Sequence, residues 1–510
     1  MDEGRVLALD LGTSSVRALL FDTAGRELPG VLARRPSGLR VGDDGTAELD
    51  PDGLVEAAGA CLDELAEHGH LDGVETVAVC CAWHTVLAVD ERGRPLSALL
   101  TWADTRAAGV ADELAGRTDP VRLHAETGAP LHETYWTVKI PWLARQLTNR
   151  PAGYLGLAEY LAARLLGAAD TSLSMASGTG LLDLKTAGWH QRAMELAGVG
   201  PGSLPALRQP GWSATLLPAA ARRWPALAAA RWQLAWGDGA ASNVGAGCVT
   251  PEFANVNIGT SAAVRTVHDA PGAPLPAALW RYRVDDRRLI TGAAFSGGGN
   301  LWQWARTVLN LPGGDALEAA LAKVPPGAGG VTVLPHLAGA RAPLDLPAGS
   351  GGVLGVSLAT TGVEIAAAAM EAVCFGLAAG LEALETALPA PPAVVASGGA
   401  VAASPWLRQT LANVLGRDVQ VTNEPEASAK GAALLALGTI PQPATTQIVH
   451  PDPSAVEAEL AAGARQQDFA ARLGYEPRSG RGGRSGWWPA AGSCQGRAAR
   501  RPWPRPPARW

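Results

Sequence analysis

The chain has 510 residues, of which 47% are hydrophobic and 18% charged, and its formal net charge is −6. This length predicts at least two domains, each with its own core, and the composition is that of an ordinary soluble protein. Residues 477–510 hold eight Arg and no acid, which leaves 34 basic against 48 acidic residues before them. The acidic body argues against nucleic acid as a main partner.

The last segment, residues 476–510, is rich in Trp, Pro, Arg and Gly and shows no periodicity. We interpret it as a disordered tail or as the product of a frameshift in GC-rich DNA. The alternative is a basic arm that binds RNA or an anionic surface.

The six cysteines show no CxxC pair and no metal-ligand spacing, which favours a reducing, cytoplasmic compartment. The N-terminus has no apolar region typical of a signal peptide. Pro and Gly interrupt the long uncharged stretches, so we expect no transmembrane helix and no membrane partner. A homodimer is left open.

The predicted elements begin with a hairpin of two strands, Val6–Asp10 and Val16–Asp22, followed by a helix at Asp50–Gly69 and a buried strand at Val74–Ala82. Two shorter strands are expected at Leu87–Asp90 and Leu96–Trp102. Strands and helices then alternate irregularly to about residue 237. The second half restarts with strands from about residue 251; its predicted elements are a helix at Gly362–Leu388, a strand at Ala393–Ala396, and helices at Pro405–Leu415 and Ala427–Leu437. This alternation predicts mixed α/β sheets flanked by helices.

A strand ending in Gly-Thr-Ser occurs twice, at Val6–Ser14 and at Ala254–Ser261. One such turn is a common hairpin, but two, each opening a long segment, predict two related halves that face each other. Gly allows close approach of phosphate oxygens, and Thr and Ser donate hydrogen bonds without bulk. The pair therefore predicts a polyanion held between the halves.

Asp10 ends the first of these strands, beside Thr13, Ser14, Ser15 and Arg17. A carboxylate next to a phosphate-binding turn suits Mg²⁺ held mainly through water. The alternative is a hairpin in which Asp10 only caps the turn.

Asp238 lies in Trp236-Gly237-Asp238-Gly239-Ala240, a loop that leads into a helix of small residues. A carboxylate there can accept the proton of a sugar hydroxyl as a new P–O bond forms. The alternative is a helix N-cap, for which Asp is a common residue.

His84 follows one buried strand, and Trp102, Asp104 and Arg106 follow the next. Hydrogen-bonding groups beside an aromatic wall suit a polyol, although a single His in such a place is more often structural. Two further strand ends are rich in Gly and precede helices, which favours the approach of a nucleotide. They are Ser397-Gly398-Gly399 and Ser296–Asn300, the latter followed by Gln303.

The order of these motifs resembles the FGGY family of carbohydrate kinases over roughly residues 5–440. The resemblance rests on Asp10–Arg17, Trp102–Arg106, Gly237–Ala240, Ile258–Ser261, Ser397–Ala400 and Gly351–Glu371. It implies two ribonuclease-H-like domains of the actin and hexokinase type with an active-site cleft between them, at 1–248 and 249–475. The N-terminal domain would bind the sugar and the C-terminal domain the nucleotide.

The resemblance also implies the roles of individual residues. Asp238 would be the catalytic base, with ATP and Mg²⁺ as cofactors and Asp10 near the metal. The residues implied around the nucleotide are Thr13, Ser14, Ser15, Arg17, Gly259, Thr260, Gly299, Gln303, Gly398 and Gly399. Those implied to face a small sugar or sugar acid are His84, Trp102 and Asp104.

Within the family the sequence is most similar to gluconate kinases, for example at Trp83–Asp90, Thr127–His132 and Ala262–Arg265. We therefore expect phosphorylation of D-gluconate at its 6-hydroxyl. Gluconate needs a cation for its carboxylate, and Arg106, His132 and Lys139 are candidates by location. The sequence departs from the family at Trp83, at Glu133–Trp136 and at Ala403, which bears on the substrate and on the nucleotide base.

Three alternatives remain at this point. A xylulokinase or another ketose or polyol kinase of the family would share His84, Asp104 and Asp238. A nucleotide-dependent binding protein of the actin and heat-shock type would share the two turns but would have no sugar pocket. A damaged gene product with an altered last helix is the third.

Overall fold

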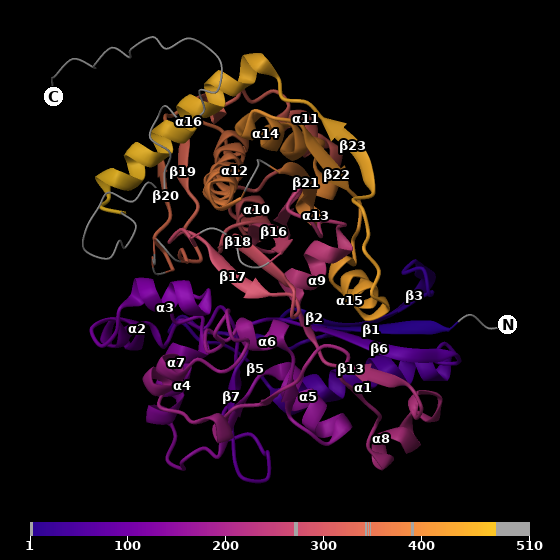
Figure 1. Ribbon diagram of the computed structural model, residues 1–510. Helices are drawn as coiled ribbons and strands as arrows, with labels where there is room; N and C mark the ends of the chain where they lie inside the picture. Colours follow the sequence, from indigo (N-terminus) through magenta and orange to yellow (C-terminus); the bar gives the residue numbers. More distant parts are fainter. Residues whose placement is uncertain are drawn as a thin grey trace.

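The computed structural model describes residues 4–269, 274–341, 344, 346, 348–388 and 392–475. Two lobes lie one above the other, and the chain passes from the lower to the upper near residue 250 (Figure 1). We call the part through α9 (Asp238–Gly245) the N-terminal lobe and the part from β15 (Phe253–Ile258) the C-terminal lobe. The predicted tail, residues 476–510, lies outside the described residues.

The N-terminal lobe is built on a mixed sheet with the strand order β12-β13-β6-β1-β2-β3, in which β14 also pairs with β6. Its strands are β1 (Arg5–Leu11), β2 (Ser15–Phe21), β3 (Glu27–Pro36), β6 (Val74–Cys81), β12 (Ser213–Ala214), β13 (Arg231–Gln233) and β14 (Trp236–Gly237). Shorter strands are β4 (Arg40–Val41), β5 (Ala47–Leu49), β7 (Leu87–Val89), β8 (Leu99–Leu100), β9 (Gly153–Leu155), β10 (Asp170–Thr171) and β11 (Ala206–Leu207). Its other helices are α1 (Pro51–Glu67), α2 (Ala108–Ala115), α3 (Pro120–Thr127), α4 (Trp136–Gln146), α5 (Leu157–Leu166), α6 (Leu173–Ser177), α7 (Gln191–Ala197) and α8 (Pro218–Arg223).

The C-terminal lobe repeats this plan with the order β17-β18-β16-β15-β21-β22-β23. Its strands, besides β15, are β16 (Ala262–Asp269), β17 (Trp280–Arg283), β18 (Arg288–Phe295), β21 (Ala393–Ser397), β22 (Val419–Thr422), β23 (Thr445–Val449) and the pair β19 (Thr332–Leu334) and β20 (Gly352–Leu354). Its helices are α10 (Gly299–Val308), α11 (Gly314–Leu321), α12 (Gly362–Ala387), α13 (Gly399–Ala403), α14 (Pro405–Leu415), α15 (Ala427–Leu437) and α16 (Pro453–Arg472). In both sheets a central strand, β1 or β15, lies between an antiparallel and a parallel neighbour.

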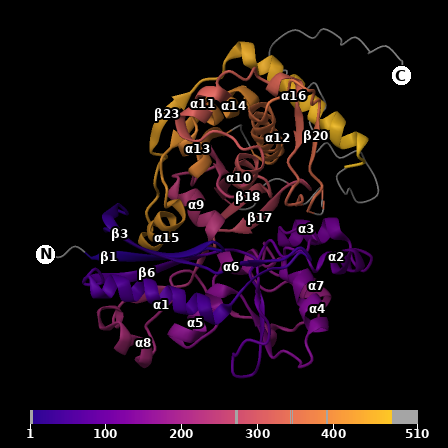
Figure 2. The ribbon, with the colours of Figure 1, turned by 180° about the vertical axis from the view of Figure 1, so that it is seen from behind.

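Strand β1 is buried on both faces of the sheet, so its apolar residues pack into two different cores, one on each face. Leu7 and Leu9 belong to the same core as Leu54 and Ala58 of α1, whereas Val6 and Ala8 pack with alanines of α15. Helix α1 begins after Asp50, whose side chain accepts a hydrogen bond from the backbone N–H of Asp52 at 3.1 Å. Figure 2 shows α1 and α5 below the sheet formed by β1 and β6.

Helix α15 belongs to the C-terminal part of the chain but packs on the N-terminal sheet, and Figures 1 and 2 both show it beside β1. It meets α9 in direct backbone contact: a Cβ added at Gly431 would lie 1.7 Å from the carbonyl oxygen of Ala241. Glycine is required there because any side chain would separate the two helices. The junction of the lobes is therefore a pair of tightly crossed helices.

Edge strand β17 is a second link between the lobes. The backbone N–H of Arg281 donates to the carbonyl of Gly128 at 2.8 Å, and a ring nitrogen of His124 lies 2.8 Å from the carbonyl oxygen of Leu279. Gly128 adopts a positive φ of 73°, and a Cβ there would meet the Arg281 carbonyl at 1.8 Å. This link places one wall of the space between the lobes.

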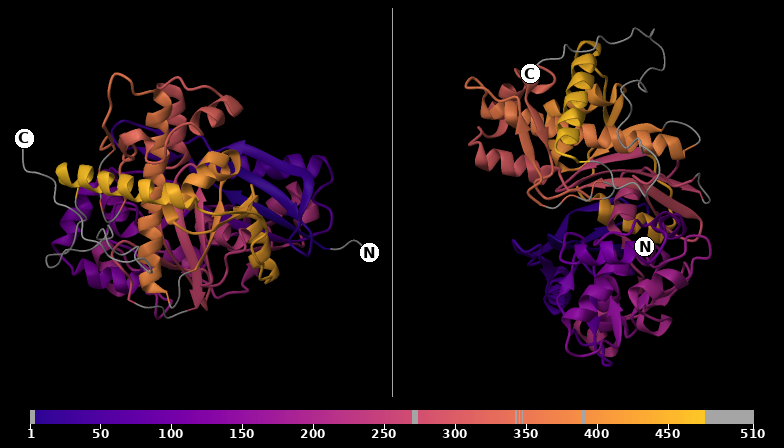
Figure 3. Two further views of the ribbon diagram at one scale, coloured as in Figure 1. Left: turned by 90° about the horizontal axis from the view of Figure 1, so that it is seen from above. Right: turned by 90° about the vertical axis from the view of Figure 1, so that its left-hand side faces the viewer.

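Most predicted elements are found within one or two residues of their expected ends, and the mixed α/β class is confirmed. The strand expected at Leu96–Trp102 was wrong in length, because only Leu99 and Leu100 pair as β8. Helix α16 was not predicted; it runs across α12 on the outer side of the C-terminal lobe (Figure 3, left). Among the described residues, α12 alone is long and apolar enough to cross a membrane, and 56% of its most apolar window is buried inside the protein. That burial is typical of a core helix.

Candidate active site

A cleft with about 810 Å³ of empty space, part of it open to solvent, lies between the lobes, and both lobes contribute to the walls of this cavity. The N-terminal lobe supplies Trp83, His84, Trp102, Pro130, His132, Thr134, Tyr135 and Asp238; the C-terminal lobe supplies Ser261, Arg265, Ala277, Ala278, Leu279, Trp280, Tyr282, Ala294 and Arg341. Four of the predicted site residues therefore meet in one space: His84, Trp102, His132 and Asp238. Aromatic rings and polar or charged side chains share the walls, which suits a small polar ligand.

Asp238 is the first residue of α9, and its side chain faces this cavity. One carboxylate oxygen accepts hydrogen bonds from the backbone N–H of Gly239 at 2.8 Å and of Trp83 at 3.4 Å. Burial raises the pKa of Asp238, while the nearby Arg265 guanidinium lowers it. The helix N-terminus also favours the ionised form. The result is a half-buried carboxylate that remains able to accept a proton.

Trp83 explains why glycine flanks this carboxylate on both sides. A Cβ added at Gly237 would lie 1.8 Å from the indole ring, and one at Gly239 would lie 2.6 Å from it. The indole N–H donates to the carbonyl of Ser174 at 2.9 Å, which fixes the ring. Trp83 thus packs on the backbone that carries Asp238 and holds it in place.

His84 is held in one protonation state. Its φ of 68° is unusual for a residue with a side chain, and its Nδ1 lies 2.5 Å from the carbonyl oxygen of Gly178. Burial lowers the pKa of His84 to about 3, so the ring is neutral. Because a carbonyl only accepts, Nδ1 carries the proton and Nε2 is left as an acceptor for a ligand hydroxyl.

An aromatic wall contributed mainly by β17 closes one side of the cavity. Trp280 and Tyr282 stack with their ring centres 4.4 Å apart, and the hydroxyls of Tyr282 and Tyr135 lie 2.6 Å apart. The sequence analysis selected only Trp102 as an aromatic wall. Trp280 and Tyr282 alternate on a strand, but nothing in the sequence showed that this edge strand crosses to the other lobe.

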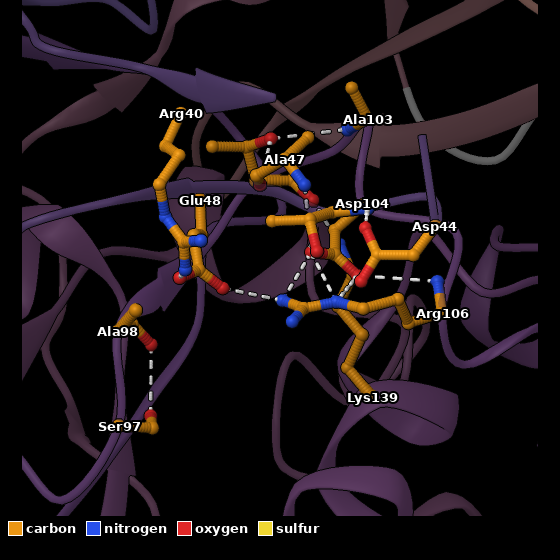
Figure 4. A network of polar contacts seen from close by, with 12 residues as sticks. Arg40, Asp44, Ala47, Glu48, Ser97, Ala98, Ala103, Asp104, Arg106 and Lys139 are labelled. Carbon is orange, nitrogen blue, oxygen red and sulfur yellow. Dashed lines mark hydrogen bonds and ion pairs between the residues drawn. The ribbon is translucent and has the colours of Figure 1, made fainter. Parts of the chain in front are cut away.

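Asp104, Arg106 and Lys139 do not line the cavity. They form a polar network beside it (Figure 4), in which Arg106 contacts Glu48 and Asp104, each at 2.6 Å. Asp104 is fully buried and also accepts from the backbone N–H of Ala47 at 3.0 Å. Lys139 is fully buried and donates to the carbonyl of Thr101, and burial lowers its pKa to about 7. The network supports the loop that carries Trp102.

The first Gly-Thr-Ser turn joins β1 to β2, with the backbone N–H of Gly12 donating to the Ser15 carbonyl at 3.1 Å. Thr13 is half-buried, Ser14 is exposed and Ser15 is buried. Asp10 is 2% exposed and pairs with Arg17, which also contacts Glu426 just before α15. Asp10 raises the pKa of Asp238, so the two carboxylates lie in one electrostatic environment.

The second turn follows β15 and lies beside the start of α10 and the end of β21. The N–H of Gly299 donates to the Gly259 carbonyl at 2.7 Å, and the N–H of Asn300 donates to the Thr260 carbonyl at 3.0 Å. Gly398 has a φ of 99°, and a Cβ there would meet the Ile258 carbonyl oxygen at 2.5 Å. The fold therefore brings Gly259, Thr260, Gly299, Gly398 and Gly399 together; Gln303 lies one turn into α10 and is exposed.

A dedicated metal cluster of three or more His, Cys, Asp or Glu side chains is absent from the described residues. Mg²⁺ in phosphoryl-transfer sites is usually held by one or two carboxylates, waters and the substrate phosphates. Asp10, buried beside the first turn, fits a site of that kind. His132 lines the cavity, with Nε2 3.4 Å from a carboxylate oxygen of Glu133.

Comparison with known proteins gives the family. Residues 5–245 match the N-terminal domain of the FGGY family of carbohydrate kinases, and residues 254–439 match its C-terminal domain. A glycerol kinase of Dechloromonas aromatica is 30% identical over 450 residues, covering 84% of this chain and 88% of that protein. The gluconokinase of Bacillus subtilis is 27% identical over 447 residues, covering 85% and 87%.

Solved structures show the same fold. The xylulose kinase of Lactobacillus acidophilus superimposes with a TM-score of 0.84 at 23% identity, covering 92% of this chain and 98% of that one. The chain belongs to the FGGY family of carbohydrate kinases, and the two-domain kinase fold expected from the sequence is confirmed. Membership makes it a carbohydrate kinase, with ATP as co-substrate.

Proposed function

We propose that the protein transfers the γ-phosphoryl group of ATP to a hydroxyl of a small sugar acid or sugar, and that D-gluconate, phosphorylated at its 6-hydroxyl, is its substrate. The observation that carries this proposal is the position of Asp238. It lies at the start of α9, on the wall of the cavity that Ser261 of the second turn also lines, and under the electrostatic influence of Asp10.

In this proposal Asp238 orients the acceptor hydroxyl and receives its proton as the new P–O bond forms. The carboxylate is suited to this role because its two backbone hydrogen bonds fix it, while burial makes it a better proton acceptor than an exposed Asp. The neutral ring of His84 offers Nε2 to another substrate hydroxyl. Closure of the lobes around the cavity excludes water and limits ATP hydrolysis.

The nucleotide is assigned to the space between the two turns. Thr13, Ser14 and Ser15 would contact phosphates from the N-terminal lobe, and Gly259 and Thr260 from the C-terminal lobe. Asp10 would hold Mg²⁺ through water, with Arg17 beside it; the bound ion would neutralise charge on the phosphates. Gly299, Gln303, Gly398 and Gly399 form the edge assigned to the ribose and base.

The choice of D-gluconate rests on the likeness to a curated gluconokinase across most of both chains. A ketopentose is the second candidate, since a xylulose kinase is also among the solved structures that share this fold. A binding protein of the actin and heat-shock type is disfavoured, because the cavity holds His84, Asp238 and an aromatic wall that such a protein would not need.

The test is ATP turnover by the purified protein with D-gluconate, D-xylulose, D-ribulose and glycerol. Turnover on gluconate, lost in Asp238→Asn, is the expected result. Turnover on a ketopentose but not on gluconate would overturn the choice of substrate, and ATP hydrolysis indifferent to every sugar would overturn the kinase proposal. Soluble expression with and without residues 477–510 tests whether the tail matters, since α16 already completes the described C-terminal lobe.

A further inference from the structure

Two arginines of the C-terminal lobe, Arg265 and Arg341, face the cavity near Asp238 but form no ion pair within the described residues. Arg265 lies on β16, and Arg341 follows β19 in a loop. Within the described ranges, neither guanidinium forms an ion pair or donates a side-chain hydrogen bond, and the Nε atom of each is buried without a partner. Other arginines near the cleft are paired, such as Arg17 with Asp10 and Arg106 with Asp104.

An unpaired guanidinium in a buried place is costly, because it has lost water without gaining a counter-charge. Burial lowers the pKa of Arg341 to about 10 and also lowers that of Arg265. A guanidinium stays protonated in proteins, so both side chains are charged near neutral pH. A ligand that brings a negative charge into the cavity would offset this loss of hydration.

The two arginines contact different parts of the cavity wall. A Cβ added at Gly239 would lie 3.3 Å from Nε of Arg265, so Arg265 lies against the first turn of α9 and influences Asp238 directly. The guanidinium carbon of Arg341 lies 4.1 Å from the ring centre of Trp102. That contact joins the C-terminal lobe to the loop supported by the Asp104, Arg106 and Lys139 network, across the space where the substrate would lie.

We propose that Arg341, stacked on Trp102, binds the carboxylate of an open-chain sugar acid, while Arg265 faces the reacting hydroxyl beside Asp238. This inference rests on the proposed function and narrows its substrate class to acids. It replaces Arg106 and Lys139, which lie outside the cavity, as the source of the cation. Planar guanidinium matches carboxylate with two parallel hydrogen bonds, and stacking on an indole fixes its plane.

The decisive experiment compares D-gluconate with its neutral amide, D-gluconamide, as acceptors. In Arg341→Gln the ratio of kcat/KM for gluconate to that for gluconamide is expected to fall about 10- to 100-fold, the usual effect of losing a hydrogen bond to a charged group. Arg341→Lys should recover part of this ratio, because lysine keeps the positive charge but cannot form the two parallel hydrogen bonds of a guanidinium. Thermal melting of each variant reports whether it folds.

Arg106→Gln is the matched control, since it removes a buried arginine from the same neighbourhood but not from the cavity wall. It is expected to lower the melting temperature and to change the acid-to-amide ratio much less than Arg341→Gln does, since it acts on Arg341 only through the Trp102 loop. Equal losses on both acceptors in Arg341→Gln, or a ratio that falls as far in Arg106→Gln as in Arg341→Gln, would overturn the assignment of Arg341.

Calorimetric binding of gluconate and gluconamide separates this inference from the kinase proposal. Tight binding of gluconate that depends on Arg341, without phosphorylation of any acceptor, would support the carboxylate site and reject the kinase proposal. If the protein phosphorylates xylulose, ribulose or D-glucitol but neither binds nor phosphorylates gluconate, the kinase proposal stands and the carboxylate site is rejected.

Discussion

The turn after β1 and the turn after β15 occupy equivalent places in two similarly ordered sheets, yet they carry different charge. Asp10 stands two residues before Gly12, and the equivalent residue before Gly259 is Asn257. Asp10 pairs with Arg17 across the hairpin, whereas the side chain of Asn257 donates to the Ser397 hydroxyl at 3.1 Å. The same backbone plan thus carries two kinds of turn: a charged turn suited to a metal and phosphates, and a neutral turn that offers phosphates only uncharged donors and continues into a glycine-lined edge suited to a nucleoside.

The largest expected effect tests whether proton transfer belongs to the N-terminal half alone. Asp238→Asn keeps the shape of the side chain but removes the proton acceptor, so kcat should fall by roughly 10²-fold or more. Steady-state kinetics with ATP and gluconate measure it, and binding of a non-hydrolysable ATP analogue serves as the control for folding. Near-normal turnover would show that another group is the base.

Replacing Asp10 makes the first turn resemble the second. Asp10→Asn should raise the Mg²⁺ concentration needed for half-maximal activity by about 10- to 100-fold, as is typical when a group that supports a metal is lost. The reciprocal variant Asn257→Asp is the comparison, and we expect it to leave the Mg²⁺ requirement unchanged. Equal effects of the two variants would contradict the assigned asymmetry.

The threonines of the two turns offer a matched pair. Thr13→Ala and Thr260→Ala should each raise KM for ATP by about tenfold, since each removes a donor to a charged phosphate. If the turns act independently, the double variant should multiply the two effects. An effect confined to one threonine would show that only one turn contacts the phosphates.

The pH dependence of activity tests whether Asp238 is the base. Burial raises the pKa of Asp238, and a base must be ionised, so kcat/KM should fall as pH drops through that raised pKa. Arg265 lowers the pKa of Asp238, and Arg265→Gln should therefore move the acid limb of the profile to higher pH. An unmoved acid limb would mean that another group titrates there.

The smallest effect concerns the helices that join the halves. Gly431→Ala places a Cβ against the backbone of α9 and should destabilise the protein by about 1–3 kcal/mol in urea unfolding. Gly463→Ala, in the middle of α16 with only ordinary contacts around its new Cβ, should stabilise by about 0.5–1 kcal/mol. A tolerated Gly431→Ala would show that α9 and α15 can separate.

The sequence by itself determined the repeated strand-turn-strand plan and the carboxylate at the head of α9. Alternation in β1 and β2, the apolar face of α1 and the glycines around Asp238 are local patterns, and local patterns report element type and sharp turns directly. The ordered motifs then indicated the family. For the same reason most predicted elements have the observed ends, while the short β8 and the unpredicted α16 show where local preference is weak.

Tertiary structure alone decided which charges face the cavity. Asp104, Arg106 and Lys139 have the composition of a binding site, but burial made them partners of one another, of Glu48 and of the Thr101 carbonyl. Arg265 and Arg341 became available because β16 and the loop after β19 line the cavity between the lobes. A sequence records a charge, but whether that charge meets a neighbour or a ligand depends on contacts between residues distant in the chain.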